Sequence, residues 1–189
     1  MLGQKATPPA VMFDLVRSGQ DGRLVLEHAR SSGDLAVRHT VWGAQRIVLV
    51  PLSGELAATA DGALSLAVAV RTAHAPARVR PAPAGAGSGA AQIRFGGSEV
   101  RRRDANLYDV AGDLTVDGVT GPAVLSVRDL GWNINGRGRE HTLALSASLP
   151  REFWRWAVTA RQTGWMLDHE AKLFLHTVWV PGPEMDPAA

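Results

Sequence analysis

The feature that most restricts the fold is an alternation between apolar and polar or small residues, which recurs along most of the chain. Such a period of two places successive side chains on opposite faces of a strand. Clusters of glycine, aspartate, asparagine and serine separate the repeats and are typical of turns. The pattern predicts about eight or nine antiparallel strands in a sandwich or barrel. The alternating segments are 23–28, 33–42, 46–60, 63–73, 92–100, 108–116, 122–130, 141–149 and 171–180.

The outer faces of the predicted strands favour a barrel over an open sheet. In the segment 64–70, leucine and valine occupy one face and small residues occupy the other. An outer face in full contact with water would carry charged side chains instead. We therefore expect a lined interior with a partly covered exterior.

The length of 189 residues suits one domain with tails. Segment 74–91 is rich in proline, alanine and glycine, so it predicts an irregular loop within that domain. The best helix candidates are 9–19 and 150–162, and the second is also compatible with an extended conformation. We expect an N-terminal extension at 1–22, a barrel domain at 23–180 and a disordered tail at 181–189.

Composition argues against several classes of function. The net charge of +2 gives little attraction to nucleic acid, and cysteine is absent. No segment approaches the roughly 18 apolar residues of a membrane span. The six histidines form no metal-binding pair, and no nucleophile–base pair or carboxylate pair is evident. We expect a cytoplasmic, non-enzymatic protein with no cofactor, no metal and no stable membrane insertion.

The segment GDLTVDGVTGPAVLSV, at 112–127, predicts two short strands around a polar elbow. Gly118 and Gly121 permit backbone angles that other residues resist, and Pro122 suits the start of a strand. On turn chemistry alone, the motif is a tight connection. With Tyr108 and the residues that follow it, the motif also resembles the signature of the YceI-like family. The segments 29–43, 92–100, 149–156 and 164–180 are similar to other parts of the family pattern, in the same order.

The resemblance implies an all-β fold, namely an antiparallel eight-stranded lipocalin-like barrel, here with one or two short helices. It further implies an interior that binds an isoprenoid, quinone or lipid chain, and a possible homodimer. The loop 74–91 replaces a family segment that helps close the barrel mouth. The alternative is a ligand-free interaction module whose barrel is filled by its own side chains. The candidate ligand-binding residues are Val37, His39, Leu66, Val68, Phe95, Val116, Leu125, Trp154 and Phe174.

Two further clusters have both a structural and a functional interpretation. The basic run at 101–104 is typical of a solvated turn, and its functional alternative is a contact with a phosphate or acidic head group. The aromatic run at 153–156 suits either core or dimer packing, or a rim of flat rings at the barrel mouth.

His39 is interpreted as a structural histidine or, at a position that resembles the family pattern, as a ligand contact.

Overall fold

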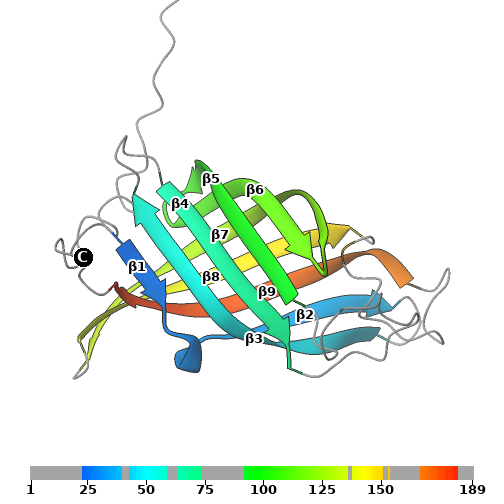
Figure 1. Ribbon diagram of the computed structural model, residues 1–189, viewed down its shortest axis with the longest axis horizontal. Helices are drawn as coiled ribbons and strands as arrows, with labels where there is room; N and C mark the ends of the chain where they lie inside the picture. Colours follow the sequence, from blue (N-terminus) through cyan, green and yellow to red (C-terminus); the bar gives the residue numbers. More distant parts are fainter. Residues whose placement is uncertain are drawn as a thin grey trace, which may run out of the picture.

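The computed structural model describes residues 23–39, 43–58, 64–73, 92–135, 138–150, 153 and 167–182, and nearly all of them lie in strands (Figure 1). All the strand pairings are antiparallel. The strands are β1 (Arg23–Leu26), β2 (Ser32–His39), β3 (Gly43–Ala58), β4 (Leu64–Thr72), β5 (Gln92–Asp104), β6 (Leu107–Val116), β7 (Val119–Asn135), β8 (Gly138–Pro150) and β9 (Leu167–Pro181).

The sheet closes into a barrel because β3 and β4 pair with each other in addition to their other neighbours. The ring runs β3-β2-β9-β8-β7-β6-β5-β4 and returns to β3. Strand β1 also pairs with both β3 and β9, so β1 and β2 share one position in the ring. The 3-10 helix η2 (His28–Arg30) separates them. The eight-stranded antiparallel barrel expected from the sequence is confirmed, with its first strand broken in two.

Helix is almost absent from the part of the chain that the structure describes. The one complete helical element there is η2, which the sequence did not predict. The candidate helix 9–19 lies outside the described residues, as does the loop 74–91. Of the candidate helix 150–162, Pro150 ends β8 and Phe153 has a helical backbone.

The polar elbow is a turn of only two residues between β6 and β7. Asp117 and Gly118 have φ values of 50° and 87°, and Val116 pairs directly with Val119. Positive φ at both central positions defines a turn whose twist matches the flanking strands. The two strands predicted around the elbow are neighbours, as expected, but the two-residue turn pairs 112–116 with 119–123, and residues 124–127 pair with 108–111. The sequence predicted that Gly121 would adopt a backbone angle that other residues resist, but Gly121 lies within β7 and has no positive φ. Its lack of a side chain instead leaves space for the ring of Phe153.

Candidate functional site

The centre of the barrel is apolar and almost full. The free space there has a volume of about 10 Å³, which is room for about one water molecule. Aliphatic side chains and one aromatic ring from five different strands surround it. These residues are Val68, Val70, Ile93, Phe95, Leu114, Leu125, Leu173 and Leu175. Among the described residues, this central space therefore has a wholly apolar wall.

Most of the predicted ligand-binding residues line this interior. Six of them are between 0% and 6% exposed and belong to the core: Val37, Leu66, Val68, Phe95, Val116 and Leu125. The backbone of His39 ends β2, but its side chain and the whole of Trp154 lie outside the described part of the chain. The structure thus brings together six of the nine candidates.

Phe174 lies on the outer face of the barrel, where it is 41% exposed, and not on the wall of the interior. Its neighbours Leu173 and Leu175 are 2% and 4% exposed. Successive side chains of a strand point to opposite faces. Since Leu173 and Leu175 face the interior, Phe174 between them points outward. Large apolar residues occur on both faces of β9, so the alternating pattern in the sequence could not show which face is the inner one.

Inward-facing glycines make room for the bulky side chains that fill the interior. A Cβ on Gly54 would lie 2.9 Å from Cη2 of Trp179, and a Cβ on Gly121 would lie 2.9 Å from Cζ of Phe153. Trp179 is fully buried, and its indole N–H donates a hydrogen bond of 2.9 Å to Oγ1 of Thr177. Sequence reasoning did not identify Trp179 as a filler, because the residues that accommodate it lie far away in the chain.

Polar groups are buried at the end of the barrel where β1 begins and β9 ends. His141 on β8 and Asp129 on β7 are 1% and 8% exposed, and Nε2 of His141 lies 2.9 Å from Oδ1 of Asp129. The Gly131 N–H donates to the same carboxylate over 2.7 Å. The ring of Trp132 packs edge-on against His141 at 4.7 Å, under the guanidinium of Arg139.

A bulge in β7 positions the Asp129 carboxylate. The pairing with β8 shifts between Asp129 and Gly131, so Leu130 is the extra residue and is 50% exposed. Gly131 has a φ of 95°, a left-handed conformation that favours glycine. The side chain of Asp129 faces the barrel interior, as do those of Leu125 and Val127 on the same strand. A charged residue at a core-facing position of the alternating pattern could therefore have indicated this site from the sequence.

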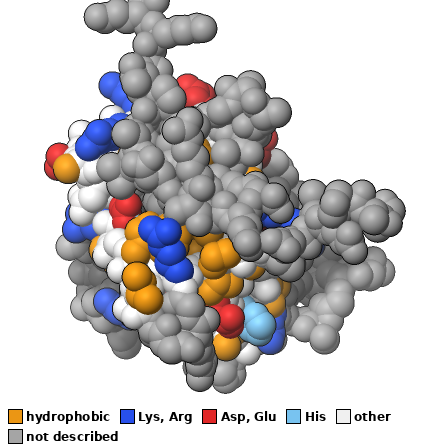
Figure 2. All heavy atoms as spheres, turned by 90° about the vertical axis from the view of Figure 1, so that its left-hand side faces the viewer, with side chains coloured by type: hydrophobic (Ala, Val, Ile, Leu, Met, Phe, Trp, Pro, Cys, Tyr) orange, Lys and Arg blue, Asp and Glu red, His pale blue; other side chains and the backbone are white. Residues whose placement is uncertain are grey.

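Figure 2 looks onto this end of the barrel, where hydrophobic side chains gather with basic groups beside them.

The pKa of Asp129 is lower than usual in the folded protein. Burial alone would raise this pKa, but the hydrogen bond and charge of His141 and the N–H of Gly131 together lower it. The ionised form is therefore favoured in the folded state. The contribution to stability is fully present above the unfolded pKa of about 3.9 and is lost as the pH falls through the folded pKa.

We expect Asp129→Asn to lower the free energy of unfolding by about 2 kcal/mol at neutral pH, because a charged hydrogen-bond partner of His141 is lost. Urea unfolding at a series of pH values from about 7 to 3 tests this. The stability of the wild type falls more steeply with acid than that of the variant. The matched control is Asp113→Asn on the exposed face of β6, which leaves the pH profile unchanged. Equal acid sensitivity in Asp129→Asn and the wild type would contradict the assignment.

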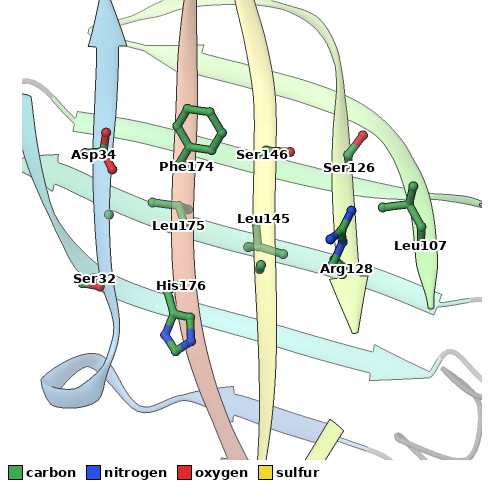
Figure 3. A pocket seen from close by; sticks show the side chains of 12 residues that line it. Ser32, Asp34, Leu107, Ser126, Arg128, Leu145, Ser146, Phe174, Leu175 and His176 are labelled. Carbon is green, nitrogen blue, oxygen red and sulfur yellow. The ribbon is translucent and has the colours of Figure 1, made fainter. Parts of the chain in front are cut away.

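A groove crosses the outer face of the barrel and has a volume of about 530 Å³ (Figure 3). Asp34, Phe174, Ser146 and Ser126 form a row across β2, β9, β8 and β7, because each is paired with the next. Small serine side chains form the floor beside the exposed ring of Phe174. A second hollow of about 410 Å³ shares Ser126, Ser146 and Phe174 with the first. This groove is open and has both apolar and polar lining residues, in contrast to the enclosed, wholly apolar space at the centre of the barrel.

The described residues contain no helix long and apolar enough to cross a membrane. Within the same residues, no group of three or more histidine, aspartate or glutamate side chains is arranged to hold a metal ion.

Comparison with solved structures places the fold among known barrels. The structure is similar to BcnA of Burkholderia cenocepacia, with a TM-score of 0.55 and 12% identity over 81% of this chain and 98% of that chain. It also matches the YCEI protein of Campylobacter jejuni, with a TM-score of 0.42 and 11% identity over 72% of this chain and 82% of the other. A polyisoprenoid-binding domain from Saccharophagus degradans, implicated in plant cell wall breakdown, matches with a TM-score of 0.44 and 10% identity over 84% and 98% of the two chains.

No protein-family model matches the sequence, and a search of curated proteins found no match. At these levels of identity, the structural likeness concerns the fold. The antiparallel barrel that the YceI-like resemblance implied is confirmed, and the likeness to BcnA concerns this fold alone.

Proposed function

We propose that the barrel binds one apolar chain, such as an isoprenoid, a quinone tail or a lipid, in its interior without catalysing a reaction. The observation that supports this is the uniformly apolar wall around the central space. Burial of a chain against such a wall contributes roughly 0.8 kcal/mol for each CH₂ group. The choice of ligand class follows the resemblance of the segment 108–127 to the YceI-like signature.

The filled interior sets a condition on this proposal. The free volume of about 10 Å³ is far smaller than an apolar chain, so the ligand displaces wall side chains on entry. Such rearrangement costs free energy and lowers the net affinity. We therefore expect binding at the micromolar level, and not the tight binding typical of a preformed pocket.

The substitution Val68→Trp tests the interior as the binding site. Val68 is 5% exposed and lines the central space, so a larger ring there blocks the ligand and overpacks the core. We expect loss of binding of a fluorescent prenyl or fatty-acid probe, with destabilisation of about 1–3 kcal/mol. Val48→Trp is the matched control, because Val48 is 60% exposed on the outer face of β3. Probe binding that survives Val68→Trp but not Val48→Trp would place the site outside the barrel.

The second candidate function is a ligand-free interaction module. The nearly full interior favours it, as does an outer groove of about 530 Å³. Under this proposal no apolar probe binds to the wild type, while Val68→Trp is still destabilised. A homodimer, a cytoplasmic location and the domain limits given above stay predictions.

A further inference from the structure

Two neighbouring hairpins form part of the end of the barrel where β1 begins and β9 ends. One joins β5 to β6 through Ala105 and Asn106, and the other joins β7 to β8 beyond the pair Asn135 and Gly138. The N–H of Asp129 donates to the carbonyl of Asn106 over 2.8 Å, and the side-chain amide of Asn106 donates to the carbonyl of Asp129 over 3.3 Å. These hydrogen bonds hold the hairpins side by side, so their exposed side chains form one surface.

The β7–β8 hairpin carries two exposed apolar side chains. Ile134 is 80% exposed and Leu130 is 50% exposed. Strand β7 pairs with β6 only as far as Arg128, so both residues lie on the part of β7 whose one described pairing partner is β8. A single exposed apolar residue is common on protein surfaces, but two of them close together at the end of a hairpin offer a contact for an apolar partner.

Basic side chains dominate the exposed charge beside these apolar residues. The basic run that ends β5 faces solvent, and β7 and β8 add further arginines. The exposed arginines are Arg101, Arg102, Arg103, Arg128 and Arg139. They outnumber the exposed carboxylates nearby, which belong to Glu99 and Asp104.

The other carboxylates near this surface already have basic partners. Oδ2 of Asp109 lies 3.6 Å from Nε of Arg103. The two carboxylates of the β7–β8 hairpin, Asp129 and Glu140, are buried and paired with basic side chains. The charge that faces solvent here is therefore mainly positive. We call this region, which comprises Leu130, Ile134 and the exposed arginines, the hairpin surface.

We propose that the hairpin surface docks on a membrane that contains anionic lipids, with its arginines among the head groups and Ile134 and Leu130 at the edge of the acyl layer. Arginines near such a membrane are attracted by its negative surface potential, and neighbouring apolar side chains gain from burial at the interface. A nucleic acid or an acidic protein surface would also attract the arginines, but it would not supply an apolar layer for the two aliphatic side chains. The contact is peripheral and crosses no bilayer.

This inference goes beyond the proposed function and does not depend on it. None of the residues of the hairpin surface lines the central apolar space, and docking is measured without a ligand in the barrel. Vesicle binding and probe binding can therefore fail separately.

The test is co-sedimentation of the full chain with vesicles of phosphatidylcholine, alone or with about 30% phosphatidylglycerol. We expect the mixed vesicles to bind at least about tenfold more tightly than phosphatidylcholine alone, because only they carry negative charge. Raising NaCl from about 0.1 M to about 0.5 M should weaken this binding, since salt screens the attraction between exposed charges.

The apolar part of the hairpin surface is tested by Ile134→Ser. We expect this variant to bind the mixed vesicles about tenfold more weakly, because an apolar side chain is lost from the acyl boundary. Val119→Ser is the matched control, since Val119 is 49% exposed at the opposite end of the same strand. It should bind as the wild type does.

The basic part is tested by Arg101→Gln, which should weaken binding to the mixed vesicles roughly fivefold. Arg94→Gln makes the same change of charge near the start of β5, away from the hairpin surface, and should leave binding unchanged. Both arginines are exposed, and circular dichroism checks that each variant keeps the fold of the wild type.

Several results would overturn the proposal. One is equal binding to the two kinds of vesicle, or none to either. Another is an equal effect of Ile134→Ser and Val119→Ser, or of Arg101→Gln and Arg94→Gln. Weaker binding in Arg101→Gln with no change in Ile134→Ser would show a patch for anions in general, which would exclude the membrane docking proposed here.

Discussion

Replacing Gly112 with alanine is expected to lower the free energy of unfolding by about 3 kcal/mol or more. Gly112 on β6 pairs directly with Gly97 on β5. A Cβ at Gly112 would lie 2.5 Å from Cα of Gly97 and would also meet the carbonyl oxygen of Gly96. Both obstacles are backbone atoms, so relief requires separation of the two strands. Urea unfolding monitored by tryptophan fluorescence measures the change.

Gly96→Ala is the matched control, because Gly96 is next to Gly97 on β5 and faces open space. A Cβ there would meet nothing within 4 Å. We expect this variant to be neutral or more stable by about 0.4–1 kcal/mol, since alanine restricts the unfolded chain. If both substitutions had similar effects, the close approach of β5 and β6 at Gly112 would not be a determinant of stability.

Replacing Trp179 with alanine is expected to destabilise the protein by about 3–5 kcal/mol, as for other large aromatic residues removed from a core. Trp179 is fully buried, packs over Gly54 and donates to Thr177. Its removal leaves a cavity inside the barrel. Apolar cavities of this kind stay dry and accept small apolar molecules. The variant should therefore regain part of its stability in the presence of benzene, measured as a rise in its melting temperature.

The control for Trp179→Ala is Phe174→Ala on the same strand. Phe174 is 41% exposed on the outer face, so its loss should cost less than about 1 kcal/mol and create no cavity for benzene. Similar losses for the two variants would mean that the interior of the barrel is not the main core. A Trp179→Ala protein with unchanged stability would lead to the same conclusion.

Local sequence was sufficient to predict the strands and the antiparallel barrel. The period of two in 64–70 corresponds to a strand whose buried residues are the expected leucines and valines. The elbow at 117–118 joins the two strands predicted around it. These features depend on neighbouring residues, because alternation and turn chemistry act over a few positions of the chain.

Only the tertiary structure decided which face of each strand is the inner one and how much space remains inside. Phe174 lies outside because Leu173 and Leu175 face the interior, and Asp129 is positioned by a bulge that shifts the register. Inside the barrel, Trp179 packs against Gly54, a residue far away in the chain that closure of the barrel brings to it. Local patterns show that a strand has two different faces. The free volume inside the barrel, however, depends on the side chains of all the strands that enclose it, and these meet only when the barrel closes.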